Sequence, residues 1–299
     1  MKSYSYRLLD VFTNVPFGGN PLAVFTDAHG LSDPQMQSIA RELNLSETTF
    51  VLPPRDRSHH SLVRVFTPLA ELPSAGFPTI GAAYALALEE RLRQESLRHR
   101  VVFEESTGPI SVTMEAPMIT MQQPVPELGP LYGERDAVAA MLGLEVNALA
   151  VGLPLQSVSG GVPYLIVPVV DLEAMQRIRF RQDIWERVLR RTPHPHVYAF
   201  TLECRYEGST CHSRMFAPGL GVLEDPATAM AAGPVAVYLA TYGILPNELR
   251  QSLVCEQGIE IGRPSFIHVT LEHSELGPRS VRVGGQCVAI GKGEIQIET

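Results

Sequence analysis

The sequence contains very little lysine. Among its 24 basic residues, only Lys2 and Lys292 are lysines, and they lie near the two ends of the 299-residue chain. A Schiff-base enzyme and a phosphate-binding P-loop each need a lysine placed within the fold, so both classes are disfavoured. The net charge of −8, without a basic stripe, also argues against nucleic acid as a partner.

Cysteine is scarce as well, and long apolar runs are missing. The chain has four cysteines: Cys204, Cys211, Cys255 and Cys287. None belongs to a C-x-x-C pair, which indicates reduced structural thiols. The longest weakly polar stretch, 229–245, is interrupted by Gly233 and Pro234 and is too short to span a bilayer. Because no secretory apolar segment follows Met1, we expect a cytoplasmic protein with no membrane partner.

Short runs typical of β-strands dominate what is present. They cover residues 6–13, 22–25, 48–52, 62–66, 100–104, 110–115, 164–170, 196–203, 212–216, 266–272 and 280–297. Turns that contain Gly and Pro separate them, at the spacing of a mostly antiparallel sheet.

Helical patterns interrupt these runs in three places. Residues 32–44 form an amphipathic pattern with Ser32 as its N-cap. Residues 78–91 and 227–242 are apolar on nearly all sides, which predicts two buried helices.

The two buried helices belong to a weak internal repeat. Phe66-Thr67-Pro68 leads through an acidic loop with Glu71 to the first helix, and Phe216-Ala217-Pro218 leads through Glu224-Asp225 to the second. The two Phe-x-Pro runs are 150 positions apart (216 − 66). We therefore predict two similar halves, each a sheet curled around one central helix.

If the two halves pack face to face, both helix N-termini can point into one cleft. Their unpaired N–H groups and dipoles favour a carboxylate there, and the acidic loops that end nearby suggest proton transfer. Glu47, between the helix ending at Asn44 and the strand 48–52, is a candidate base. From the residues alone the alternative stays open that Glu47 is a solvated turn acid, or a capping acid that bonds nearby backbone, since most loop glutamates are exposed.

The order of short motifs along the whole chain carries a resemblance. The motifs are Asp10-Val11-Phe12-Thr13, Gly18-Gly19-Asn20-Pro21, Asn44-Leu45-Ser46-Glu47-Thr48-Thr49-Phe50, Phe66-Thr67-Pro68, Glu71-Leu72-Pro73, Ala75-Gly76, Glu224-Asp225-Pro226-Ala227-Thr228, Gln257-Gly258, Gly262-Arg263-Pro264-Ser265 and Val283-Gly284-Gly285. In this order they resemble the PhzF-like family of phenazine-biosynthesis isomerases, whose fold is shared with diaminopimelate epimerase.

The resemblance implies an α+β fold of two pseudo-symmetric halves, each a mostly antiparallel β-sheet curled around a central helix. We expect the first domain to span residues 1–120 plus about 288–299, and the second to span 121–287. A homodimer without metal or organic cofactor is implied, with a small anionic carboxylate substrate in the interdomain cleft. In the family, the acid that matches Glu47 is the proton shuttle, and the acid that matches Asp225 assists it. The remaining candidate substrate-binding residues are Asn20, Ser46, Gly76, Phe77, Thr228, Ala229, Met230 and Arg263.

The sequence departs from the family pattern at two matching places. Phe77 stands where the family has histidine, and Ala229-Met230 stand where it commonly has Gly-Ser. In epimerase relatives these positions carry paired acid/base cysteines, so a two-cysteine mechanism is excluded here. We expect a cofactor-independent isomerase or epimerase whose substrate has an apolar or aromatic body and one carboxylate. The alternative is a non-catalytic binding or regulatory member of the family.

Two histidine pairs are possible metal ligands. They are His59-His60 and His194-Pro195-His196. Neither has acidic or cysteine partners at ligand spacing, so we predict that these histidines lie at the surface.

Overall fold

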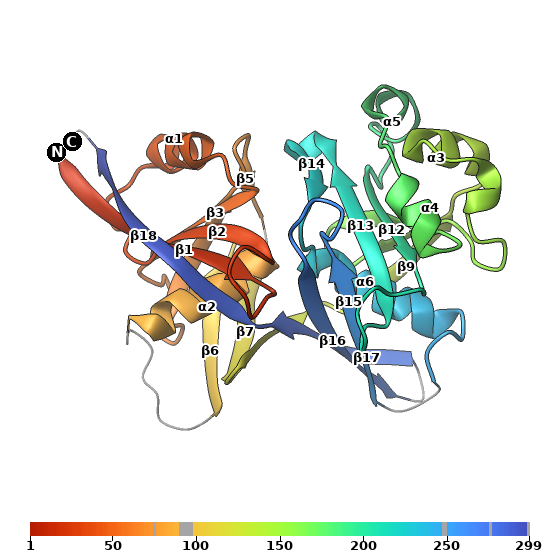
Figure 1. Cartoon of the computed structure of the whole chain (residues 1–299). Coiled ribbons are helices and arrows are strands. Elements are labelled where there is room, and N and C mark those ends of the chain that lie inside the picture. Colours follow the sequence, from red (N-terminus) through yellow and green to blue (C-terminus); the bar gives the residue numbers. More distant parts are fainter. Residues whose placement is uncertain (74–75, 90–97, 247–249, 275–276, 298–299) are drawn as a thin grey trace. The chain divides into compact units, whose positions relative to one another are not determined.

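The computed structural model describes residues 1–73, 76–89, 98–246, 250–274 and 277–297 (Figure 1). The chain divides into two compact units. The first consists of Met1–Gln122 and Gly284–Thr299, and the second of Gln123–Val283. No helix in the described part of the chain is both long enough and apolar enough to cross a membrane.

The first unit is a mostly antiparallel sheet that curls around one helix. Its elements are β1 (Lys2–Val11), β2 (Asn20–Phe25), α1 (Asp33–Leu43), β3 (Glu47–Leu52), β4 (Ser61–Phe66), β5 (Glu71–Leu72), α2 (Phe77–Leu88), β6 (Arg98–Glu105), β7 (Gly108–Glu115), β8 (Met118–Gln123) and, from the end of the chain, β18 (Cys287–Ile297). Helix α2 contacts β1, β2, β3, β4 and β7, while α1 covers β3 and β4 from outside (Figure 1).

The second unit repeats this plan. Its elements are β9 (Glu127–Leu131), α3 (Arg135–Leu142), η1 (Val146–Ala148), β10 (Gln156–Ser159), β11 (Pro163–Pro168), α4 (Leu172–Arg177), α5 (Gln182–Val188), β12 (His196–Thr201), β13 (Cys211–Ala217), η2 (Pro218–Leu220), β14 (Val222–Asp225), α6 (Ala229–Thr241), β15 (Arg250–Gln257), β16 (Ser265–Ser274) and β17 (Gly277–Gly285), whose last two residues belong to the first unit. Helix α6 contacts β9, β10, β11 and β16.

Strand pairing shows that the two units share one topology. In the first unit β1–β2, β3–β4 and β6–β7 pair antiparallel, while β2–β3 and β4–β6 pair parallel. In the second unit β10–β11, β12–β13 and β15–β16 pair antiparallel, while β11–β12 and β13–β15 pair parallel. The predicted fold of two similar halves, each curled around a central helix, is confirmed.

The repeat extends to an ion pair beside each Phe-x-Pro run. Arg64 donates from Nε and Nη2 to the two carboxylate oxygens of Glu71, at 2.7 Å each. Arg214 does the same to Glu224, at 2.8 and 2.7 Å. The repeated motif is therefore Arg-x-Phe-x-Pro, with each arginine clamping the acid on the strand that precedes the central helix.

The central helices are buried because their sequences are small and apolar on every side. In α2, Gly81 lies so close to the sheet that a Cβ added there would be 2.3 Å from Cδ2 of Leu22. Both α2 and α6 end close to their predicted limits, although Arg91, the predicted end of the first, lies outside the described residues.

The first helix also follows its prediction. Helix α1 begins after Ser32, whose backbone N–H donates to Oε1 of Gln35 at 2.9 Å, and it ends at Asn44 in the left-handed conformation. An aromatic cluster of Phe25, Phe50 and Phe66 fixes it to the sheet, with ring centroids 5.0 and 5.5 Å apart.

One predicted strand was wrong in extent. The run 280–297 divides into β17 and β18, with Gln286 between them. The carbonyl of Gln286 accepts hydrogen bonds from the backbone N–H groups of Phe12 and Thr13 instead of continuing a ladder. The uniform β-propensity of this run did not reveal that partner.

Candidate functional site

Glu47 is the first residue of β3. Asn44, with φ of 50°, ends α1, and only Leu45 and Ser46 separate it from the strand. Glu47 and Ser46 are half-buried, whereas Thr48 and Thr49 are fully buried. Glu47 is therefore a half-buried acid at the start of a strand, and its role stays a prediction.

Asn20 and the start of α2 lie at the same end of the first unit as Glu47. Glu47 is the register partner of Leu22, two residues along β2 from the buried Asn20. Gly81, in the second turn of α2, packs on Leu22. At the far end of α2, the C-cap residue Glu89 accepts a hydrogen bond at 2.9 Å from Arg7, which precedes Val11, the register partner of Asn20, by four residues on β1. Helix α2 therefore begins near the Asn20 end of the sheet.

The residues at the start of α2 are enclosed. Gly76 is its N-cap, and Phe77, its first residue, is only 3% exposed. The phenyl group that replaces the family histidine is therefore part of the packing of this unit. It supplies an apolar surface and no proton donor.

A buried acid that sequence reasoning missed lies next to this helix. Glu105, the last residue of β6, is 7% exposed and accepts a short hydrogen bond from the hydroxyl of the fully buried Thr79 in the first turn of α2. In the second unit Gln257, the last residue of β15, holds the same place. Gln257 belongs to the motif Gln257-Gly258, which the sequence analysis found. Nothing in the local sequence around Glu105 distinguishes this residue from an ordinary acid at a hairpin turn.

Asp225 lies in a closed hydrogen-bond network in the second unit. Its Oδ2 accepts from the hydroxyl of Thr228 at 2.6 Å, and its backbone carbonyl accepts from Nε2 of Gln257 at 2.7 Å. Gln257 also donates to the Thr228 hydroxyl at 3.0 Å and accepts from the Thr228 backbone N–H at 3.2 Å. Asp225 and Thr228 are 5% and 6% exposed, so this cluster is largely shielded from water.

The first turn of α6 and the loop with Arg263 complete this cluster. Thr228 is the N-cap of α6, and the carbonyl of Ala229 accepts from Nε2 of Gln123 at 3.1 Å. The same amide lies 3.6 Å from the sulfur of Met230. The half-buried Arg263 closes a loop by donating its backbone N–H to the carbonyl of Gly258 at 2.8 Å.

The structure thus brings the predicted residues together in two groups. In the first unit they are Asn20, Ser46, Glu47, Gly76 and Phe77, and in the second they are Asp225, Thr228, Ala229, Met230 and Arg263. Gly76 and Phe77 lie at the start of α2, and Thr228, Ala229 and Met230 lie at the start of α6. A helix N-terminus favours an anion. The predicted cleft that joins both groups stays a prediction.

Two acids that the sequence placed near the site are occupied. Glu71 and Glu224 are held by Arg64 and Arg214 through paired hydrogen bonds. Both carboxylate oxygens of each acid are thus engaged by one guanidinium group. Glu71 and Glu224 are therefore no longer candidate bases. The remaining candidates are Glu47 and Asp225, and the buried Glu105 is a third acid to consider.

The prediction that all histidines of the two pairs lie at the surface is wrong for one pair. His60 is exposed and His59 half-buried, but His194 and His196 are only 6% and 8% exposed. They pack against Tyr132 and Tyr164, and burial lowers the pKa of His196 to about 4. Within the described residues no group of three or more His, Cys, Asp or Glu side chains is placed to hold a metal ion.

Two of the cysteines, Cys211 and Cys255, are buried structural residues. The sulfur atoms of Cys211 on β13 and Cys255 on β15 lie 3.4 Å apart in the core of the second unit. The hydrogen bond with Cys255, together with burial, raises the pKa of Cys211 well above its ordinary value. Such a thiol stays protonated and does not replace the paired cysteines of an epimerase.

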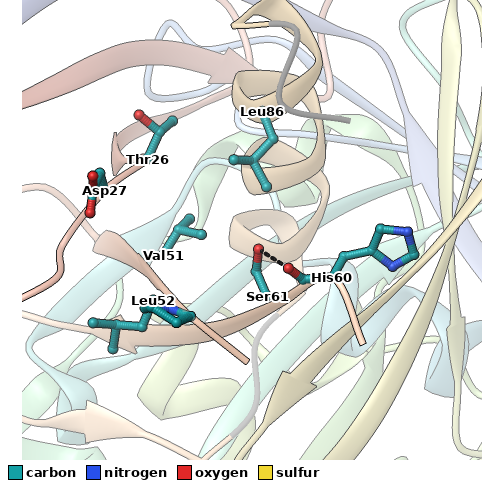
Figure 2. A pocket seen from close by; sticks show the side chains of 8 residues that line it. Thr26, Asp27, Val51, Leu52, His60, Ser61 and Leu86 are labelled. Atoms are coloured by element: carbon teal, nitrogen blue, oxygen red, sulfur yellow. Dashed lines mark hydrogen bonds between the residues drawn. The ribbon is translucent and has the colours of Figure 1, made fainter. Parts of the chain in front are cut away.

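A surface cavity of the first unit lies elsewhere. It is lined by Thr26, Asp27, Val51, Leu52, Pro53, His60, Ser61 and Leu86 (Figure 2). Leu86 belongs to the last turn of α2, roughly 13 Å along the helix from Phe77. The cavity is therefore at the opposite end of α2 from Glu47 and is separate from the candidate site.

The two repeated halves, each a sheet around a central helix, define the class of epimerase-like folds. The chain also matches the family model for phenazine biosynthesis-like proteins (PhzC-PhzF) over residues 9–293. The protein belongs to this family.

Individual relatives agree with this assignment. The chain is 38% identical to an uncharacterized isomerase of Mesorhizobium japonicum, with 99% of this chain and 100% of that protein covered. It is 35% identical to the trans-2,3-dihydro-3-hydroxyanthranilate isomerase of Pseudomonas fluorescens, with 98% and 99% covered. These names support an isomerase activity for the chain.

Solved structures show the same fold. The PhzF-family phenazine biosynthesis protein of Bacillus anthracis matches with a TM-score of 0.90 at 30% identity, over 99% of this chain and 100% of that one. A probable proline racemase of Agrobacterium radiobacter matches with a TM-score of 0.71 at 12% identity, over 99% and 93%. The second likeness extends to the fold alone.

Proposed function

We propose that the protein is a cofactor-independent isomerase or epimerase that moves a proton on a small carboxylate-bearing substrate. Glu47 of the first unit is the proton shuttle, and Asp225 of the second unit assists it. The observation that carries this proposal is the setting of Glu47. Glu47 is half-buried at the start of β3, directly before the fully buried Thr48 and Thr49, whereas Glu71 and Glu224 are held by arginines.

Arg263, in the loop beside Asp225, is the candidate partner of the substrate carboxylate, because a guanidinium pairs with this anion in a bidentate manner. Gly76, at the start of α2, and Thr228, at the start of α6, are further candidate contacts. Asn20 and Ser46 contribute polar contacts beside Glu47. Apolar contacts come from Phe77, Ala229 and Met230.

The substrate body is apolar or aromatic. Phe77 and Met230 offer neither a proton nor a strong hydrogen bond, so a densely hydroxylated ring gains little from them. The dihydro-hydroxyanthranilate of the Pseudomonas relative is therefore one member of the test panel and not the assumed substrate. The isomerase names of the relatives favour catalysis over the alternative of a protein that only binds a ligand.

The decisive test is incorporation of solvent deuterium. The protein is incubated in D₂O with trans-2,3-dihydro-3-hydroxyanthranilate and a panel of small aromatic and apolar carboxylic acids, and incorporation is followed by mass spectrometry. Glu47→Gln should slow incorporation at least about 100-fold, the usual scale for loss of a general base. Glu71→Gln is the matched control, because its acid is already bound by Arg64. Undiminished incorporation in Glu47→Gln would exclude Glu47 as the shuttle.

We also propose a homodimer, as the family resemblance implies, and a cytoplasmic location, as the sequence analysis predicts. Sedimentation equilibrium of the purified chain distinguishes a dimer from a monomer. A single species of 32.8 kDa at micromolar concentration would contradict the dimer.

A further inference from the structure

The hairpin that follows the central helix differs between the two units. In the first unit Glu105 pairs with Gly108, so β6 and β7 are joined by a tight turn. In the second unit Gln257 pairs with Ser265, which leaves residues 258–264 outside the ladder of β15 and β16. We call this segment the 258–264 loop. It is an addition to the repeated fold, and it carries Arg263.

The two ends of the loop meet beside Asp225. Gly258 has φ of +78°, and a Cβ added to it would lie 2.4 Å from the carbonyl oxygen of Arg263 and 2.5 Å from that of Pro226. These close approaches place the loop directly on the residue that follows Asp225. The position of Arg263 relative to the Asp225 cluster therefore depends on how the loop is held.

A buried histidine holds the middle of the loop. On β13, the His212 side chain is 1% exposed, and its Nδ1 lies 2.8 Å from Oε1 of Glu256 on β15. Its Nε2 lies 2.8 Å from Oε1 of Glu260, in the middle of the loop. Glu256 is itself fixed, because it accepts the backbone N–H groups of Arg205 and Tyr206 at 2.6 and 3.0 Å. The loop is thus linked through one imidazole ring to the sheet.

The geometry requires a charged ring. Ionised carboxylates only accept hydrogen bonds, so a histidine that bonds one at each nitrogen must donate from both. Burial alone would lower the pKa of His212, but the hydrogen bonds and charges of Glu256 and Glu260 raise it to about 9. Burial would raise the pKa of Glu260, but the hydrogen bond and charge of His212 lower it, and the charge of Arg214, two residues along β13 and paired with Glu224, lowers it further. The nearby Cys204 thiol stays neutral, because burial raises its pKa to about 11.

The first unit has no histidine at the position that corresponds to His212. Glu104 matches Glu256 and accepts the backbone N–H groups of Arg55 and Asp56 at 3.1 and 2.7 Å. Its register partner on β4 is Leu62, which holds the place that His212 takes opposite Glu256. The same topology therefore forms without a buried imidazolium, and the histidine occurs in the unit that has the added loop.

We propose that His212 is a positioning residue that, by donating to Glu256 and Glu260, fastens the 258–264 loop and sets Arg263 beside Asp225 and Thr228. Any effect of His212 on catalysis rests on the function proposed above. The fastening of the loop by His212 does not depend on that function.

The test is hydrogen–deuterium exchange of the full-length protein, read by mass spectrometry and corrected for intrinsic exchange rates. Glu260→Gln removes the loop carboxylate and keeps the pair of His212 with Glu256. His59→Gln is the matched control, because His59 contacts Glu104 at 3.1 Å in the first unit and holds no such loop. Glu260→Asp tests whether a shorter carboxylate restores the link.

In Glu260→Gln at pH 7, exchange in 258–264 should rise at least tenfold, with β15 and β16 unchanged. Glu260→Asp should recover part of the protection, and His59→Gln should match wild type. In wild type the loop should lose protection as the pH rises through about 9, and Glu260→Gln should lack this step. Wild-type protection of the loop in Glu260→Gln would overturn the proposal. Because no substrate is used, a negative deuterium-incorporation result with substrates leaves this test unaffected.

Discussion

Single acidic residues differ in this protein by what their carboxylates touch. Glu71 and Glu224 are paired with arginines, and Asp225 accepts a hydrogen bond from a threonine hydroxyl. Glu256 accepts hydrogen bonds from a histidine ring and from two backbone N–H groups. Glu47 stands at a strand start beside buried threonines. Environment, and not residue type, separates the candidate base from the structural acids.

Gly258 is the residue whose size matters most to the second cluster. Gly258→Ala should destabilise the protein by about 2–4 kcal/mol, since the new methyl group meets two backbone carbonyls and a left-handed alanine costs about 1–2 kcal/mol. Gly208→Ala is the control, with φ of +86° and open space around its Cβ, and it should cost only the backbone part. Urea denaturation measures both, and equal losses would contradict the close packing of the loop on Pro226.

At the scale of elements, the repeated Arg-x-Phe-x-Pro strand fixes each acidic strand before its central helix. The two copies differ in burial. The side chain of Arg214 is 7% exposed and also donates to the carbonyl of Met175 at 2.8 Å, whereas that of Arg64 is 17% exposed and also pairs with the exposed Asp33.

This difference predicts unequal costs of removing the two arginines. Arg214→Ala leaves Glu224 and two backbone carbonyls without their donor in a buried setting, which should cost about 3–5 kcal/mol. Arg64→Ala should cost about 1 kcal/mol, because solvent replaces more of what is lost. Chemical denaturation monitored by circular dichroism compares the variants. Similar costs would show that burial does not distinguish the two copies.

At the scale of the whole molecule, His212 makes stability depend on pH. The unfolded chain releases this proton near pH 6.5 and the folded protein at about 9. The stabilisation is therefore complete below pH 6.5, declines between these values and is lost above about 9. A shift from 6.5 to about 9 corresponds to roughly 3 kcal/mol.

The unfolding free energy of wild type should therefore fall between pH 6.5 and 9, as measured by urea titrations across that range. Glu260→Gln should show a shallower fall, because one of the two charges that raise the pKa of His212 is gone. His59→Gln should follow wild type. A flat wild-type profile over this window would contradict a charged His212 in the folded protein.

The sequence by itself determined the two-fold plan, because this plan depends on local patterns. The apolar runs of α2 and α6, the repeated Phe-x-Pro and the N-cap at Ser32 each act over a few residues, and propensity and periodicity report such effects directly. The order of short motifs likewise identified the family and the candidates Glu47 and Asp225.

Only the tertiary structure decided which of these residues meet and which acids are occupied. The pairing of Arg214 with Glu224, the contact of Thr79 with Glu105, and the link from His212 to Glu260 join residues that are 10 to 48 positions apart and lie on different elements. His194 and His196 were predicted at the surface but are buried, and each packs against a tyrosine from another part of the chain. A hydrogen bond or a buried charge depends on the partner across the fold, and no local pattern in the chain specifies that partner.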